Sequence, residues 1–156
     1  MPPAVLFVCL GNICRSPMAE GAMRDAAARA GIKIETDSAG TGGWHAGDAP
    51  DPRAQAEAAR NGVDISDLRA RQVSAQDFHR FDHIIAMDAE NLSDLRRIDP
   101  GDGKAVLSLM LDHTPDQKGR SVADPYLGGR AGFQTTWHEV QAGTAGLLAK
   151  ITAAQG

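Results

Sequence analysis

The chain has 156 residues, a net charge of −4 at neutral pH, and 42% hydrophobic and 23% charged residues. That length predicts one domain, residues 1–156, large enough to bury a core without disulfides or structural metals. The acidic balance argues against a general nucleic-acid binder. No apolar run reaches the ~20 residues that span a bilayer, and the run 5–8 is too short, and lacks a preceding basic segment, for a secretory signal. We therefore expect a cytoplasmic protein with neither nucleic acid nor membrane as a partner, and a monomer by default.

The chain contains only two cysteines, Cys9 and Cys14. A secreted fold framed by disulfides would usually have more, and a structural zinc site usually has four ligands. The five histidines show no metal-ligand spacing. We expect no metal and no cofactor.

The first elements are a strand and a helix. Residues 5–8 are wholly apolar, as in a parallel strand covered on both faces. After the segment 9–15, a helix is predicted with Ser16 as its cap, Pro17 in its first position and Gly31 at its end. Its buried face is expected to carry the residues spaced by four: Met18, Ala22, Ala26 and Ala30.

The middle of the chain continues the alternation. Residues 33–38 alternate apolar with charged side chains, which predicts a second strand. The glycine-rich stretch 39–43 is typical of a loop. The alanine-rich stretch 52–60 predicts a helix that stops at Asn61 and Gly62.

The second half follows the same pattern. Residues 83–87 predict a buried third strand, and Asp88 a cap for a helix with Leu92 and Leu95 facing inward. Residues 105–111 predict a fourth strand or its approach. A final helix is predicted from a core stripe at alternating steps of four and three: Phe133, Trp137, Val140, Thr144, Leu147 and Ile151.

Strands that alternate with helices predict an α/β fold with parallel pairing and right-handed crossovers. The expected result is an open sheet with helices on both faces. Such sheets bind ligands at the carboxyl ends of their strands, near the point where strand order reverses. Residues 9–16 follow the carboxyl end of the first strand.

The segment 9–16 has the features of a phosphate-binding loop. A loop between a strand and a helix can curl so that its backbone N–H groups converge, and the helix adds its positive end. Gly11 allows a tight backbone, and Arg15 supplies a planar fork for two phosphoryl oxygens. Cys9 begins this loop, where the nearby dipoles favour its thiolate, and Ser16 can donate a hydrogen bond to the sulfur.

A thiolate beneath a bound phosphate is placed for in-line attack. Taken alone, Cys9 would be interpreted as a small buried hydrophobe at a strand end. The joint occurrence of cysteine, five residues, arginine and serine between a strand and a helix favours the catalytic interpretation.

Residues 9–20 resemble the signature of the low-molecular-weight protein tyrosine phosphatases. Further segments resemble the family in the same order along nearly the whole chain: 37–41, Trp44, 51–53, 70–72, 87–92 and 124–126. The resemblance implies a four-stranded parallel sheet flanked by helices, a phosphatase I-like variant of the flavodoxin-like three-layer architecture, and no metal. It also implies phosphotyrosine-containing proteins as substrates and inorganic phosphate as product.

The resemblance assigns roles to individual residues. Cys9 would be the nucleophile, Arg15 the phosphate clamp, and Asp124 the acid that protonates the leaving phenolate and then activates water. Without the resemblance, Asp124 would be a structural loop residue before a proline. Trp44 and Tyr126 would be walls of the substrate slot. The residues expected to bind phosphate or support the loop are Leu10, Gly11, Asn12, Ile13, Cys14, Ser16 and Ser38.

The chain departs from the family at two positions. Leu68 stands where many members have a histidine in the hydrogen-bond network behind the loop, so the support of Asn12 is expected to be rebuilt or weaker. Leu127 replaces the second tyrosine of some relatives, which removes regulation through two adjacent tyrosines.

Three other functions remain open from the sequence. Arsenate reduction on this scaffold needs a relay of further cysteines, which two cysteines do not supply. Phosphoarginine phosphatases resemble this loop but carry threonine where this chain has Ile13, whose apolar side chain suits an aromatic ring better. A non-catalytic phosphate-binding module would not need Cys9, Arg15 and Asp124 together. A reversible Cys9–Cys14 disulfide that protects the nucleophile is a separate hypothesis, against the alternative that Cys14 merely packs behind the loop.

Overall fold

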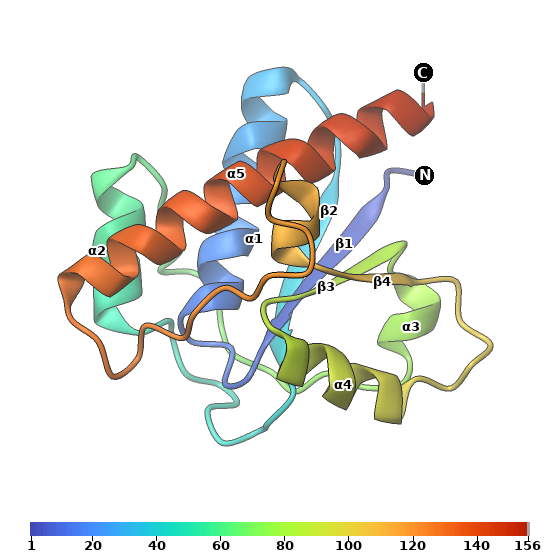
Figure 1. Cartoon of the computed structure of the whole chain (residues 1–156), viewed down its shortest axis with the longest axis horizontal. Helices are drawn as coiled ribbons and strands as arrows, with labels where there is room; N and C mark the ends of the chain where they lie inside the picture. The colour runs from blue at the N-terminus through green and yellow to red at the C-terminus, as the bar shows by residue number, and fades with distance from the viewer. Residues whose placement is uncertain (156) are drawn as a thin grey trace.

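The computed structural model describes residues 1–155. Its centre is a sheet of four parallel strands in the order β2-β1-β3-β4 (Figure 1). The strands are β1 (Ala4–Cys9), β2 (Glu35–Gly40), β3 (His83–Ala86) and β4 (Val106–Leu109). The four-stranded parallel sheet that the sequence predicts is confirmed.

Helices cover both faces of the sheet (Figure 1). Their bounds are α1 (Arg15–Ala30), α2 (Pro52–Arg60), α3 (Asp77–Arg80), α4 (Ala89–Ile98) and α5 (Arg130–Gln155), and a 3-10 helix, η1, spans Met110–His113. On one face, Val5 and Phe7 of β1 join a core cluster with residues of α1 and α5. On the other face, Leu6 and Val8 join a second cluster that includes Phe78. Because both faces of β1 are buried, its sequence is apolar throughout, as expected of a central parallel strand.

The strand order reverses at β1. The chain passes from β2 over β1 to β3, so the carboxyl ends of β1 and β3 lie next to each other at the switch point. Ligands of open α/β sheets bind at this point. Cys9 ends β1, and Asp88 follows β3 and caps α4 by accepting a hydrogen bond from the backbone N–H of Asn91 at 2.7 Å, as predicted.

The predicted start of the first helix is wrong. The helix α1 begins at Arg15, with Cys14 in the cap position and no side-chain capping bond. Ser16 therefore lies inside the first turn, where its hydroxyl is free for another partner. The predicted buried face is also wrong at its end, since Ala30 is exposed and Ala27 is buried instead. Four residues cover slightly more than one helical turn of 3.6 residues. A stripe of residues spaced by four therefore drifts around the helix, away from its buried side.

Other elements differ in extent. The second strand begins at Glu35, later than predicted, and runs to Gly40. The fourth strand stops at Leu109, since the chain then tightens into η1. The short helix α3 was not predicted. The bounds of α2 and the buried stripe of α5 are confirmed. Among the helices formed by residues 1–155, none combines the length and apolar composition needed to cross a membrane.

Candidate active site

A pocket of about 200 Å³ opens at the carboxyl end of β1. It is lined by Cys9, Leu10, Gly11, Ile13, Cys14, Arg15, Trp44, His45, Asp124 and Tyr126. The three residues that the sequence analysis identified as catalytic and both predicted slot walls therefore share one cavity, although 115 positions separate the first from the last of the three.

The thiol of Cys9 is buried and has two polar neighbours. The Ser16 hydroxyl lies 3.0 Å from Cys9 Sγ, and the backbone N–H of Asn12 donates to the same sulfur at 3.3 Å. The Ser16 oxygen also accepts a hydrogen bond from Asn12 Nδ2 at 2.8 Å, which leaves its own hydrogen available for Cys9. With the positive end of α1 nearby, these donors stabilise negative charge on the sulfur.

Asn12 holds the loop in shape. Its backbone is left-handed, with φ 58°, a conformation that asparagine tolerates better than most residues. Its side chain is 3% exposed, donates to Ser16, and accepts from the backbone N–H of Arg71 at 3.0 Å. The left-handed backbone and two buried side-chain hydrogen bonds therefore occur together in this one residue.

The loop keeps donors free for an anion. Within residues 1–155, no hydrogen bond uses the backbone N–H of Gly11, Ile13 or Cys14 as its donor. The start of the loop is pinned to the segment after β2, since Thr41 N donates to Cys9 O at 2.9 Å. At Gly40 a side chain would come within 2.8 Å of the Leu10 carbonyl oxygen, so this close approach requires glycine.

Arg15 is fixed in place by partners from two distant segments. Its Nη1 donates to Asp88 Oδ2 at 2.7 Å and to the Val122 carbonyl at 2.9 Å. Its Nη2 lies 3.7 Å from Asp124 Oδ2. The side chain is 3% exposed, so the guanidinium presents its remaining N–H groups to the pocket from a single position.

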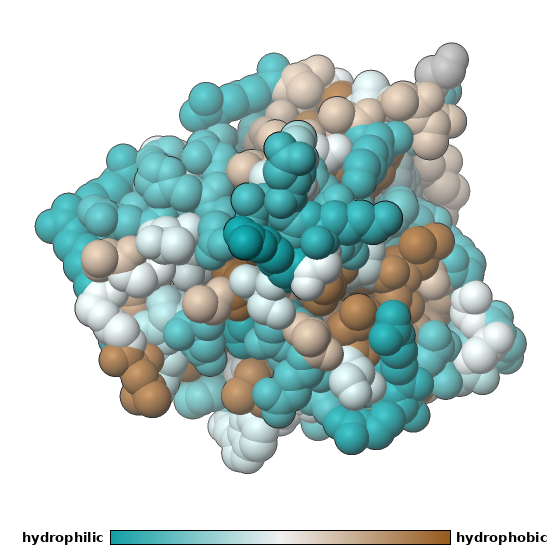
Figure 2. Space-filling view, in the orientation of Figure 1, coloured by the Kyte–Doolittle hydropathy of each residue, from teal (hydrophilic) through white to brown (hydrophobic). Residues whose placement is uncertain are grey.

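Asp124 and the aromatic walls form the rim. One carboxylate oxygen of Asp124 accepts from the backbone N–H of Tyr126 at 3.0 Å, and the other faces Arg15. Trp44 is 72% and Tyr126 46% exposed, as expected of rim residues. On the face shown in Figure 2, hydrophilic residues prevail, and one of the small hydrophobic areas lies over the loop that leads into α5. Leu127, almost fully exposed, belongs to that loop.

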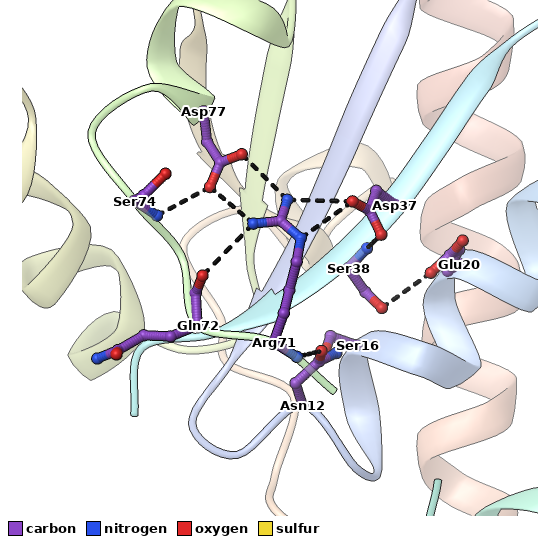
Figure 3. A network of polar contacts seen from close by, with 9 residues as sticks. All are labelled: Asn12, Ser16, Glu20, Asp37, Ser38, Arg71, Gln72, Ser74 and Asp77. Atoms are coloured by element: carbon purple, nitrogen blue, oxygen red, sulfur yellow. Dashed lines mark hydrogen bonds and ion pairs between the residues drawn. The ribbon is translucent and has the colours of Figure 1, made fainter. Parts of the chain in front are cut away.

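A polar network lies behind the loop (Figure 3). The guanidinium of Arg71 pairs with Asp37 at 3.1 Å and with Asp77 at 3.0 Å. The hydroxyl of Ser38 donates to the buried Glu20 at 2.8 Å, and burial raises the pKa of that carboxyl. The hydrogen bonds of Ser38 thus run to Glu20 and Asp37 rather than to the loop, so any support that it gives the loop is indirect, through α1.

Several residues of the site were not identified from the sequence. Asp88 was expected only as a helix cap, yet it also binds Arg15. Val122 was not singled out. Arg71 appeared only within the segment 70–72 that resembles the family, and His45 only as one of the five histidines without metal-ligand spacing. The ion pair of Arg15 and Asp88 joins residues 73 positions apart, and a single sequence carries no signal of such a pairing.

Cys14 differs from Cys9 in its surroundings. Burial raises the pKa of the Cys14 thiol, with the nearby Asp51 carboxylate adding to the effect. It therefore stays protonated at neutral pH. Both cysteines are free thiols, and residues 1–155 contain no group of three or more potential metal ligands.

A tetrahedral dianion suits this site, because loop residues with unused backbone N–H groups and a fixed guanidinium line the same pocket as a thiol at the positive end of a helix. Fold and site together are those of a cysteine-dependent phosphatase. The chain belongs to the low molecular weight phosphotyrosine protein phosphatase family, whose model matches residues 4–155.

Individual relatives agree with this assignment. The low molecular weight protein-tyrosine-phosphatase YfkJ of Bacillus subtilis is 46% identical, with 95% of each chain covered. Its crystal structure superposes with a TM-score of 0.93 at 43% identity, covering 100% of this chain and 98% of that one. The human low molecular weight phosphotyrosine protein phosphatase is 41% identical over 87% of each chain. The structure of a Drosophila arginine phosphatase also matches, at 30% identity and TM-score 0.89, covering 94% of this chain and 96% of that chain.

Proposed function

We propose that this phosphatase hydrolyses phosphotyrosine in proteins through a phosphocysteine on Cys9, with Arg15 as the phosphate clamp and Asp124 as the general acid and base. The observation that carries the proposal is that the Cys9 thiol, the arginine held by Asp88, and the Asp124 carboxylate line one pocket. Alternatives on the same scaffold are less favoured, because the relatives of higher identity are phosphotyrosine phosphatases.

In the first step, the Cys9 thiolate attacks phosphorus opposite the tyrosine oxygen. The S–P bond forms as the P–O bond breaks, and the protonated Asp124 carboxyl gives its proton to the leaving phenolate. The three equatorial oxygens gain charge, which the free loop N–H groups and Arg15 stabilise. The Ser16 hydroxyl stabilises the thiolate before the attack and again when it leaves.

In the second step, water hydrolyses the phosphocysteine. The Asp124 carboxylate, now deprotonated, takes a proton from the water as its oxygen attacks phosphorus. The S–P bond breaks, Cys9 returns as a thiolate, and inorganic phosphate leaves. The protein needs no redox partner in this cycle, since every proton and electron pair is accounted for by substrate and water.

The walls of the pocket favour an aromatic phosphoester. Trp44 and Tyr126 stand at its rim, and Ile13 lines it. A flat ring can stack between such walls while the phosphate reaches the bottom of the pocket. An apolar Ile13 offers no partner to a guanidinium, which disfavours phosphoarginine.

The test is an assay of the reduced protein in EDTA on phosphotyrosine, phosphoserine and phosphoarginine peptides. We expect turnover of phosphotyrosine, its abolition by Cys9→Ser, and a loss of about 10²–10⁴-fold in Asp124→Asn, the usual contribution of a general acid. Phosphate binding without turnover of any peptide would instead support a binding module. Gel filtration and cell fractionation test the accompanying predictions of a monomer and a cytoplasmic location.

A further inference from the structure

The loop that carries Asp124 is held at two points, one on each side of that residue. Before it, the carbonyl of Val122 accepts a hydrogen bond from Arg15 at 2.9 Å. After it, the carbonyl of Gly128 accepts one from Arg53 Nη1 at 3.3 Å. The first anchor belongs to the phosphate clamp. The second comes from α2, an element to which the proposed function gives no role.

The residues between Asp124 and the second anchor form a compact turn. The Asp124 carboxylate accepts from Tyr126 N at 3.0 Å, and the Pro125 carbonyl accepts from Gly128 N at 2.9 Å. Two hydrogen bonds within five residues leave this segment little freedom to bend internally. A displacement of Gly128 is therefore passed on to the Asp124 carboxylate.

The planar guanidinium of Arg53 stacks on two aromatic rings beside the turn. Its guanidinium carbon lies 5.4 Å from the centre of the Tyr126 ring and 4.8 Å from the centre of the Phe133 ring. Phe133 is fully buried near the start of α5, which lies beside α2 in Figure 1. A guanidinium stacks on aromatic faces more effectively than an ammonium. Arg53 thus contacts the turn through both a ring and a carbonyl.

Asp51 connects Arg53 to the phosphate loop. Arg53 Nε donates to Asp51 Oδ1 at 3.1 Å and Nη2 donates to Asp51 Oδ2 at 2.9 Å, which is a two-point pairing. These hydrogen bonds lower the pKa of the Asp51 carboxyl, so it stays ionised. The backbone N–H of Asp51 donates to the Ile13 carbonyl in the phosphate loop at 2.8 Å. A continuous set of contacts therefore runs from Ile13 through Asp51 and Arg53 to Gly128.

We propose that Arg53 is a positioning residue that fixes Asp124 relative to the phosphate loop, so that proton transfer to the leaving group depends on it. This inference rests on the proposed role of Asp124. Arg53 reaches the reaction only through the turn. Its loss would penalise substrates whose leaving groups need the proton, namely esters of basic phenols such as tyrosine, more than esters of acidic phenols.

The test compares Arg53→Met with the wild type on aryl phosphates whose leaving phenols range from acidic, such as p-nitrophenol, to basic, such as phenol itself. We expect kcat/KM of Arg53→Met to fall about tenfold for phenyl phosphate and phosphotyrosine, and to change little for p-nitrophenyl phosphate. Arg53→Lys, which keeps the charge but loses the two-point pairing, should show a smaller loss with the same trend. Arg60→Met, on the same helix and remote from the turn, is the matched control.

A second measurement separates positioning from a general loss of folding. In an Asp124→Asn background, Arg53→Met should cost no further activity, because the group that it positions is already absent. An equal loss on all the aryl phosphates, a loss that adds to that of Asp124→Asn, or no loss at all would each overturn the inference. If Asp124→Asn itself kept full activity, the proposed function would fail first, so the two failures are distinguishable.

Discussion

Replacing Asn12 by alanine removes the residue that shapes the phosphate loop. The substitution deletes hydrogen bonds to Ser16 and from the backbone N–H of Arg71, both at a site that is 3% exposed. Leaving such buried partners unsatisfied costs about 1–3 kcal/mol. Alanine must also adopt the left-handed backbone at φ 58°, which costs about 1 kcal/mol. We expect the free energy of unfolding to fall by about 2–4 kcal/mol.

Urea unfolding followed by circular dichroism measures this loss, and Asn12→Gly is the matched control. Glycine loses the same hydrogen bonds but accepts the left-handed backbone, so Asn12→Gly should be about 1 kcal/mol more stable than Asn12→Ala. Both variants should lose most of their activity, because Ser16 is no longer oriented toward Cys9. If Asn12→Ala unfolded within about 0.5 kcal/mol of the wild type, the hydrogen bonds of Asn12 would not be holding the loop.

Three further outcomes are expected. Asp88→Asn keeps an acceptor for the cap of α4 but removes the charge beside Arg15, so kcat/KM should fall about tenfold while the far-ultraviolet dichroism is unchanged. After brief peroxide treatment, dithiothreitol should restore the wild type but not Cys14→Ser. Oxidation of Cys9 to a sulfenic acid removes the negative sulfur that adds to burial and Asp51 in raising the pKa of Cys14, so Cys14 can then lose its proton, attack the sulfenic acid and release water. Mass spectrometry that found no such disulfide would refute this. Burial lowers the pKa of the half-buried His113 from 6.5 to about 4. As the pH falls from about 6.5 to 4, the unfolded chain therefore binds a proton at His113 before the folded protein does. Urea titrations should show that the free energy of unfolding falls by about 1–2 kcal/mol over this range, after allowance for solvent screening, and that His113→Gln lacks this fall.

The parts of the fold that the sequence predicted are those fixed by local signals. The apolar run of β1, the alanine-rich α2 and the cap of α4 at Asp88 depend on neighbours within a few residues. The start of α1 was mispredicted because the prediction relied on a local signal alone. Serine before proline is a strong local cap signal, but Ser16 bonds instead to Cys9 and Asn12. A local preference was overridden by the requirements of the phosphate loop.

The unpredicted parts of the site come from contacts between distant segments. Asp88 approaches Arg15 because β1 and β3 are neighbours in the sheet. Arg71 reaches Asn12 across 59 positions because its segment pairs with the end of β2, where Gly40 bridges Gln72. Neither pairing follows from spacing or composition, and both become evident only once the strand order is known.

Position 68 shows how a contact between distant segments can take over the role of a side chain. Leu68 stands where many family members have a histidine that supports the phosphate loop. Leu68 packs against the core cluster that includes residues of α1, and its apolar side chain offers no hydrogen bond to the loop. Asn12 is instead supported by a backbone N–H, that of Arg71, whose own guanidinium is held by Asp37 and Asp77 (Figure 3). Neither a backbone N–H nor a guanidinium loses its proton near neutral pH. A histidine in this place would titrate in that range, whereas the support built through Arg71 keeps the same charge and the same donor throughout it.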